Sequence, residues 1–242
     1  MYVLSLCNAY DGPNACPISD EGITLHSKVR NGHPKDGDYS AAIKSCLFTR
    51  YNLKDKGARD RFWEHLPAKF EVYKQATVAN GDRIRAADHQ GHIEEDTDCR
   101  DATFIRVSDC YPSCPSHHLI FNPHPPQYSL LRDIYEHIPS RKPTFKGIEY
   151  FGQLKKILVT ELPPSVVPAT TQPKKIILAI IGPREAASET SLGIPYYTEP
   201  TKVTPRAVDM NTVMCLVGRI KDRGRWAIVD RSGDMARAEF ID

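Results

Sequence analysis

The sequence has no long hydrophobic run. Its longest stretch of consecutive apolar residues is Ile176 to Ile181, whereas a helix that spans a membrane needs about 20. The first residues, Met1 to Cys7, are apolar, but they lack the basic region of a secretion signal and are followed by Asn8 and Asp11. We therefore expect no membrane partner and an intracellular location, in the nucleus or the cytoplasm.

The sequence also lacks an excess of one charge and a disulfide pattern. Lys and Arg total 32 against 30 Asp and Glu, so the net charge of +2 cannot make the whole surface attractive to a polyanion. Any nucleic-acid surface must be local. The 7 cysteines are odd in number and follow no framework spacing, which favours a reducing compartment.

Three common catalytic motifs are missing, namely G-x-S-x-G, the P-loop and G-x-G-x-x-G. His92 and Glu94, followed by Cys110 and Cys114, have the residue types of a zinc deaminase, but that chemistry needs a P-C-x-x-C pair. The two cysteines of this chain are separated by three residues, so the deaminase pattern is not met. We expect no enzyme, and we keep as the alternative a zinc-dependent enzyme that uses His92, Glu94 and the Cys/His loop.

That Cys/His loop is the one candidate metal site. Cys110, Cys114, His118 and His124 could supply the four ligands of a tetrahedral zinc site. The flanking prolines and the lack of a second tight pair favour instead a Pro-, His- and Cys-rich loop without metal. We therefore expect no cofactor, with zinc as the alternative.

Apolar runs punctuated by turn residues predict a mainly β fold of the α+β kind. The expected strands are 83–87, 102–107, 150–162, 175–181, 212–220 and 226–229. A helical pattern over 58–73 is broken by Pro67, and a second short helix is expected over 130–138. We predict a small SH3-like or BAH-like (bromo-adjacent-homology-like) β-barrel with short helices and long irregular loops.

Four segments follow from this pattern. Residues 1–57 are expected to be irregular or disordered, and 58–107 to carry short helices and the first strands of the barrel. Residues 108–147 form a Pro-rich inserted loop with one short helix, and 148–242 form the barrel core. The predicted core residues are Ile157, Val159, Ile177, Ile180, Val213, Leu216, Val217, Trp226 and Ile228.

A predicted hairpin between the last two strands gathers positive charge. The candidate nucleic-acid-binding residues are Arg219, Lys221, Arg223, Arg225 and Arg231. A basic β-ribbon can contact phosphates, but a charged tip also keeps a strand edge soluble. Similarly, Tyr196 and Tyr197 either line a ligand site or, as is more common, pack against the barrel.

Several blocks of the sequence resemble one family. They are Arg100 to Arg106, Tyr150 to Val159, Lys175 to Ile180, Leu192 to Tyr197, and above all Val208 to Arg219 with Asp222 to Gly233. In content and order they are similar to the C-terminal region of proteins encoded by CACTA-type (En/Spm-like) transposons of mushroom-forming fungi. The resemblance covers roughly residues 58 to 107 and 148 to 242, and it is strongest in the last forty or so.

The resemblance implies an accessory region that lies downstream of a catalytic transposase domain and has no reaction of its own. The residues 108–144 and the first fifty depart from the pattern. We therefore predict a non-catalytic binding or interaction module of transposon origin that contacts DNA or a chromatin protein through the basic hairpin. A degenerate transposase fragment without function is the other alternative.

Overall fold

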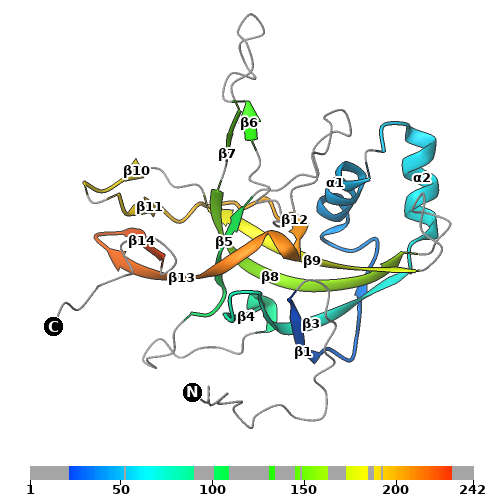
Figure 1. Ribbon diagram of the computed structural model, residues 1–242, viewed down its shortest axis with the longest axis horizontal. Helices are drawn as coiled ribbons and strands as arrows, with labels where there is room; N and C mark the ends of the chain where they lie inside the picture. The colour runs from blue at the N-terminus through cyan, green and yellow to red at the C-terminus, as the bar shows by residue number, and fades with distance from the viewer. Residues whose placement is uncertain are drawn as a thin grey trace, which may run out of the picture.

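The computed structural model describes residues 22–51, 53–89, 101–108, 131–133, 145–147, 149–162, 173–184, 188–191 and 193–230. Strands dominate this part of the chain, which confirms the prediction of a mainly β fold (Figure 1). Within it, no helix has both the length and the apolar character needed to cross a membrane.

Short helices and strands of very different length follow one another along the chain. In order they are β1 (Thr24–Lys28), β2 (His33–Pro34), α1 (Ser40–Arg50), α2 (Lys56–His65), β3 (Lys69–Thr77), β4 (Arg83–Arg85), the 3-10 turn η1 (Ala87–His89), β5 (Phe104–Ser108), β6 (Leu131–Asp133), β7 (Phe145–Gly147), β8 (Glu149–Leu162), β9 (Lys174–Arg184), β10 (Ser188–Glu189), β11 (Pro195–Tyr197), β12 (Arg206–Asp209), the 3-10 turn η2 (Met210–Thr212), β13 (Val213–Asp222) and β14 (Arg225–Asp230).

One large antiparallel sheet organises the fold. Its main path runs β1-β3-β8-β5-β13-β14-β11-β10, while β9 pairs with the other edge of β8 and β12 lies beyond β9. The long strand β8 pairs with β5 through residues 149–153 and with β3 through 157–159. Among the described strands, no pairing joins β1 to β10, so a closed barrel is not formed by this path.

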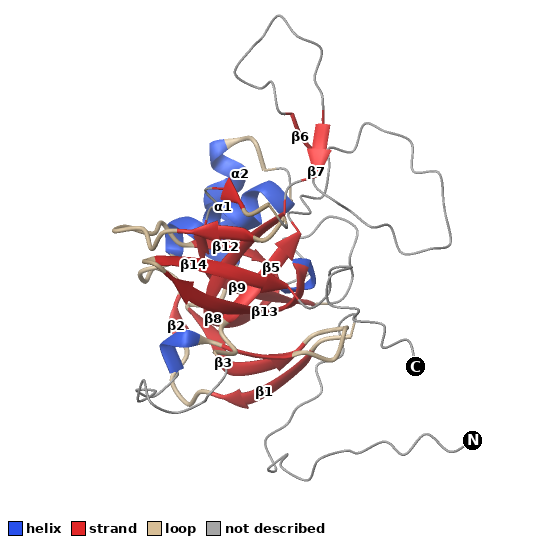
Figure 2. Cartoon of the chain, turned by 90° about the vertical axis from the view of Figure 1, so that its left-hand side faces the viewer, coloured by secondary structure: helices blue, strands red, loops and turns tan. Residues whose placement is uncertain are grey.

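Both faces of the sheet are buried around β8 and β9. On β9, Ile177, Ala179 and Ile181 join a core with β1, β3, β4 and β5, whereas Ile176, Leu178 and Ile180 face the helices. Figure 2 shows both helices on one side of the strands. Because successive strand side chains point to opposite faces, the unbroken apolar run that the sequence shows at 176–181 fits a strand covered on both sides.

The predicted strands and core are largely confirmed. Strands β4, β5, β8, β9, β13 and β14 lie where the sequence predicts them. All the predicted core residues are buried except Leu216 and Trp226, which are partly buried against the core clusters.

The helical pattern over 58–73 is only half right. Helix α2 begins after Asp55, whose carboxylate accepts the Ala58 N–H, and it ends at His65. Leu66 is extended with ψ 147 because the following Pro67 disfavours the helical region for the residue before it. The apolar residues Phe70 and Tyr73 therefore lie on strand β3 and not on a helix.

The structure also differs from the expected irregular N-terminal segment. Strands β1 and β2 and helix α1 lie within 1–57, and Leu25, Ile43 and Leu47 are fully buried. The turn residues around Asn31 and Gly32 connect ordered elements, because β1 pairs with β3 on one side of the turn and β2 pairs with β3 on the other.

The short helix expected over 130–138 is not seen where the chain is described. Residues 131–133 form strand β6, which pairs with β7 through Leu131 and Gly147. Strand pairing thus overrides the local helical pattern. Apart from Ser108 and the residues of β6 and β7, the expected loop at 108–147 lies outside the described part.

Candidate nucleic-acid interface

The predicted basic hairpin is present as strands β13 and β14. Its two central turn residues, Arg223 and Gly224, have φ angles of 46° and 81°, which is the backbone of a two-residue turn that suits the twist of the strands. Figure 1 shows this hairpin at one end of the molecule, with β10 and β11 beside it and the helices at the other end.

The strand register divides the hairpin into two faces. Arg219 lies opposite Ile228 and Lys221 opposite Trp226, which places these four side chains on the inner face. Ile220 lies opposite Ala227 and Asp222 opposite Arg225, which places these on the outer face. Strand β11 extends both faces, since Tyr197 pairs with Trp226 and Tyr196 with Ala227.

Arg219 is held inside the protein. Its guanidinium carbon lies 3.4 Å from the centre of the Phe104 ring and 4.5 Å from that of Trp226. The same group donates to an Asp101 carboxylate oxygen at 2.6 Å and to the Tyr197 hydroxyl at 2.9 Å. Its side chain is only 15% exposed, so Arg219 is a structural cation and is poorly placed to contact a ligand.

A second ion pair closes the inner face. Arg106 on β5 donates to Asp230 at 2.6 Å, and the thiol of Cys215 lies 3.6 Å from the other Asp230 oxygen. Burial raises the pKa of Tyr197 although the nearby Arg219 opposes the shift, so its hydroxyl stays protonated at neutral pH. The inner face is therefore a small apolar core crossed by two ion pairs.

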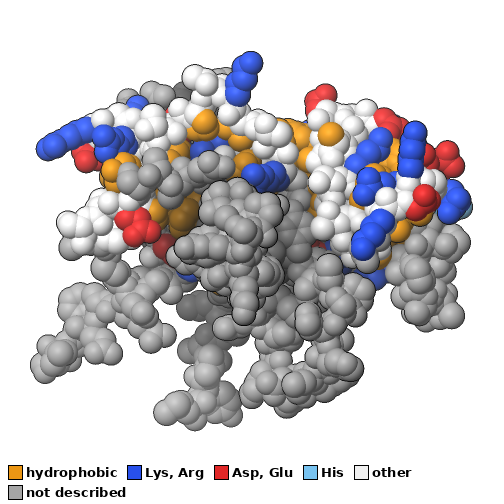
Figure 3. Space-filling model, turned by 90° about the horizontal axis from the view of Figure 1, so that it is seen from above, with side chains coloured by type: hydrophobic (Ala, Val, Ile, Leu, Met, Phe, Trp, Pro, Cys, Tyr) orange, Lys and Arg blue, Asp and Glu red, His pale blue; other side chains and the backbone are white. Residues whose placement is uncertain are grey.

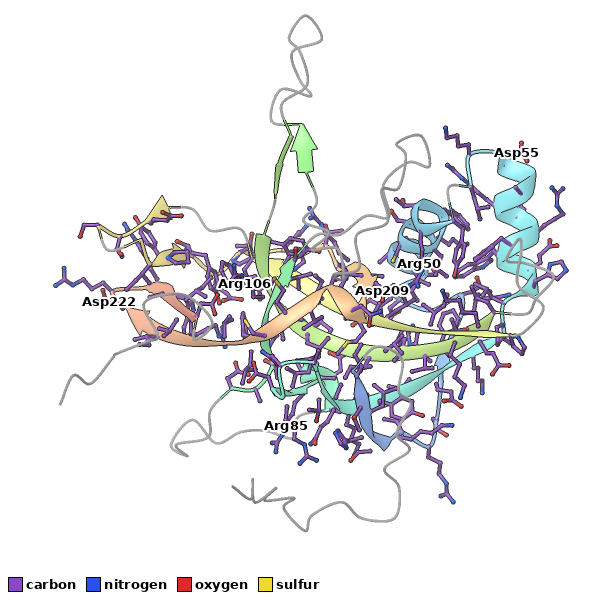
Figure 4. All side chains as sticks on the ribbon, viewed as in Figure 1. Arg50, Asp55, Arg85, Arg106, Asp209 and Asp222 are labelled. Atoms are coloured by element: carbon purple, nitrogen blue, oxygen red, sulfur yellow. The ribbon has the colours of Figure 1, made fainter. Side chains whose placement is uncertain are left out.

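The remaining cations of the hairpin are exposed. Lys221, Arg223 and Arg225 are all exposed, and the Arg223 side chain is 94% exposed. Lys221 lies 5.7 Å from the Trp226 ring centre and Arg225 lies 5.0 Å from that of Tyr196. Figure 4 places Asp222 at the far end of the hairpin, well away from Arg106, and Figure 3 shows Lys and Arg side chains that project at this end.

The structure thus brings together some of the predicted site residues and not others. Lys221, Arg223 and Arg225 form an exposed cluster, which we call the basic tip, while Arg219 belongs to the core. Arg231 lies outside the described residues, as do the candidate metal residues His92, Glu94, Cys110, Cys114, His118 and His124. Within the described residues, no group of His, Cys, Asp and Glu is arranged to hold a metal ion.

Sequence reasoning missed the partners of Arg219. Asp101 and Phe104 are 118 and 115 residues away in the chain, and only the pairing of β5 with β13 brings them close. The sequence feature that bears on these partners is the aromatic pair Tyr196 and Tyr197. Tyr197, which accepts from Arg219, packs in the core at 1% exposure, whereas Tyr196 stays partly exposed.

A hollow lies between α1 and β12. Its volume is about 480 Å³, and its lining includes Asp38, Tyr39, Tyr150 and Arg206. Arg206 lies 5.9 Å from the Tyr150 ring centre. The two charged residues that line this hollow, Asp38 and Arg206, have opposite signs. The hollow therefore offers no net attraction for a polyanion.

A group of titratable side chains adjoins Tyr39. Its hydroxyl donates to Asp88 at 3.1 Å, and Lys156 lies 3.6 Å from that carboxylate. Burial and the charge of Asp88 raise the pKa of Tyr39 to about 12. Burial and the charge of Lys156 lower the pKa of both His33 and His89, so both imidazoles are neutral at neutral pH. We therefore interpret this group of side chains as part of the packing of the fold.

Comparison of the chain with protein-family models, with curated proteins and with solved structures gives no match.

Proposed function

We propose that this chain is a non-catalytic binding module of transposon origin that contacts the phosphate backbone of a nucleic acid through the basic tip. The observation that supports this most directly is that the cations of the hairpin lie in different environments. Arg219 is neutralised within the protein by Asp101, whereas Lys221, Arg223 and Arg225 stay exposed at the end of the molecule.

The charge at the tip favours a polyanion. Asp230 is paired with Arg106, so the carboxylate that remains among the three exposed cations is that of Asp222, 4.0 Å from Arg223. Among the described residues of the tip, three cations against one carboxylate leave a local positive charge on a chain that is nearly neutral overall. Phosphate contacts from Lys and Arg supply most of sequence-independent nucleic-acid affinity.

The opposite end of the molecule is less suited to this role. Helix α2 carries Lys56, Arg59 and Arg61, but Asp60 and Glu64 lie on the same two turns. Arg59 also donates to the Leu53 carbonyl at 2.6 Å. Mixed signs at this end give a solvated surface, and they provide a charge-matched control for experiments.

The transposon origin rests on the blocks of sequence that resemble transposon-encoded proteins. The most similar block spans β13 and β14, which carry the proposed contact. An antiparallel sheet with a hairpin at one end also suits the SH3-like or BAH-like architecture proposed from the sequence, which is an analogy of fold and not of function. A module that contacts DNA would act in the nucleus. The residues of the zinc-enzyme alternative lie outside the described part of the chain.

The test is a charge reversal at the tip. We expect the double variant Arg223→Glu and Arg225→Glu to lose at least tenfold in affinity for a random-sequence DNA duplex at low salt. The slope of log affinity against log salt should fall by roughly 2, one for each lost phosphate contact. The double variant Lys56→Glu and Arg61→Glu changes the net charge equally at the helix end and should bind like the wild type. Equal losses in both variants, or none in either, would contradict the proposal.

A further inference from the structure

We infer that the outer face of the hairpin binds the bases of a single-stranded nucleic acid, with Arg223 and Arg225 of the basic tip on its phosphates. The apolar part of this outer face consists of Tyr196, Gly218, Ile220, Ala227 and Val229. This inference rests on the proposed function, because it names the kind of nucleic acid that the same hairpin would take.

The outer face is apolar and open to solvent. Ile220 is 59% exposed and Val229 is 39% exposed, although both occupy strand positions in the middle of paired segments. Gly218 adds no side chain, and a Cβ built there would meet its nearest atom only at 3.6 Å. The result is an exposed apolar surface across β13 and β14, which we call the shelf, and the partly exposed Tyr196 on β11 continues it.

Cations border this shelf. Arg225 follows the turn on the outer face and lies 5.0 Å from the Tyr196 ring centre, and Arg223 is at the turn itself, 94% exposed. The Asp222 carboxylate, 4.0 Å from Arg223, also lies at this border. An apolar and aromatic surface edged by Arg side chains is the combination on which unpaired bases stack while their phosphates are neutralised.

A duplex would leave most of this surface unused. Its bases are stacked inside the helix, so a duplex offers phosphates to the basic tip but little apolar surface to Ile220 and Val229. Three neighbouring strands span about 10 Å, and about three stacked nucleotides of one strand occupy the same length at about 3.4 Å each. An unpaired strand that crosses β11, β14 and β13 therefore matches both the chemistry and the size of the shelf.

The experiment compares a labelled 12-nucleotide oligothymidine with a 12-base-pair duplex at low salt, by fluorescence anisotropy. For the wild type we expect about tenfold tighter binding of the single strand. Two variants test the shelf: Tyr196→Leu keeps an apolar side chain and removes the ring, and Ile220→Ser removes exposed apolar surface. Each should reduce the single-strand preference by fivefold or more and leave duplex binding unchanged. Lys202→Ser is an exposed control on the chain before β12 and should change neither.

The outcomes separate the two proposals. Equal binding of single strand and duplex, lost together in the variant Arg223→Glu and Arg225→Glu, would overturn the inference and leave the proposed function in place. No binding of either nucleic acid would overturn both. A dimer of the wild type in light scattering, dissociated by Ile220→Ser, would show that a second copy of the chain covers the shelf, and this too would overturn the inference.

Discussion

Arg219 shows why a charged residue cannot be assigned to a surface by its type alone. It sits between the Phe104 and Trp226 rings and pairs with Asp101, so its planar guanidinium combines stacking with directed hydrogen bonds. Arg223, four residues on, makes no comparable set of contacts at 94% exposure. Two arginines on one strand and its turn thus have different roles.

The first prediction separates these roles by stability. We expect Arg219→Lys to lower the free energy of unfolding by about 1–3 kcal/mol, because an ammonium cannot stack and bond to both Asp101 and Tyr197. The matched change Arg223→Lys should stay within about 0.5 kcal/mol of the wild type. Urea unfolding followed by tryptophan fluorescence measures both, and equal effects would contradict the assignment of Arg219 to the core.

A second residue, Asp82, stabilises the sheet where the register of β13 with β5 is irregular. The pairing of β13 with β5 shifts register between Val213 and Cys215, and the Leu216 N–H just beyond is taken by an Asp82 carboxylate oxygen at 2.8 Å. A buried N–H without a partner is costly, so this contact from a residue 134 positions away stabilises the irregular strand.

The second prediction follows from this contact. Asp82→Ala should lower the free energy of unfolding by about 1–3 kcal/mol, the usual cost of leaving a backbone donor unsatisfied. Asp222→Ala removes a carboxylate that is 75% exposed and should change stability by less than about 0.5 kcal/mol. Chemical denaturation tests the pair, and a neutral Asp82→Ala would show that the Leu216 N–H does not depend on this carboxylate.

At the scale of elements, the hairpin turn carries a conformational cost. Arg223 adopts a φ of 46°, in the left-handed region that a side chain with a Cβ enters only at a cost. Gly224, at 81°, enters it freely. The turn would therefore be better served by Asn at its first central position.

The third prediction uses this cost to separate folding from binding. We expect Arg223→Asn to raise the free energy of unfolding by up to about 1 kcal/mol while it weakens nucleic-acid binding and lowers the salt slope by roughly 1. Thermal unfolding and a salt titration of binding measure the two effects. A variant that is destabilised and still binds fully would contradict both the turn geometry and the role of Arg223.

The junction of β2 with α1 gives a pH-dependent contribution to stability. Burial, and after it the charge of Lys156, lowers the pKa of His33, while Asp38 and Asp88 oppose the shift. Since the unfolded imidazole titrates near its ordinary value of about 6.5, the unfolded chain takes up the proton first as the pH falls. Stability from this group is full above that value and declines as the pH drops toward the lowered pKa.

The fourth prediction is a fall in melting temperature between pH 7.5 and pH 5.5 that depends on His33. His33→Gln keeps a polar side chain that does not titrate, so its fall should be smaller than that of the wild type. His65→Gln is the matched control, because it makes the same replacement at an exposed histidine. An identical pH dependence in the wild type and in His33→Gln would contradict the assignment.

Strands could be predicted from the sequence where β-branched runs end at turn residues, as in β8, β9, β13 and β14. The N-terminal elements could not, because β1 and β2 are short and acquire their order from β3, about 35 to 55 positions further along. The end of α2 was predictable from Pro67. The continuation as β3 was not, because apolar residues at 70 and 73 fit a helix as well as a strand and only pairing decides between them.

The candidate site was predictable in part for a similar reason. The turn residues Asp222 to Arg225 lie between two apolar runs, and this local pattern alone indicates a hairpin with exposed cations at its turn. The burial of Arg219 depends on Asp101 and Phe104, which only the assembled sheet brings near. The local sequence thus predicts the hairpin and its turn. The assembled fold determines which cations of the hairpin are exposed to a ligand.

At the scale of the whole molecule, the long strands β8 and β9 separate two ends. The helices cover the apolar face of the sheet at one end, where Arg50 pairs with Asp209 and ties α1 to β12 (Figure 4). The hairpin with its basic tip and exposed apolar shelf lies at the other end. This division predicts that a bound nucleic acid slows amide exchange at the hairpin end and leaves amide exchange at the helix end unchanged.

The most direct test of this account is amide hydrogen exchange of the full chain, with and without a single-stranded oligonucleotide at low salt. We predict added protection at residues 219–230 and on β11, and no change on β1, α1 and α2. Strand amides of the hairpin should exchange more slowly because the ligand suppresses their local opening. Protection that rises instead at the helix end, or nowhere, would contradict the claim that this hairpin is the binding surface.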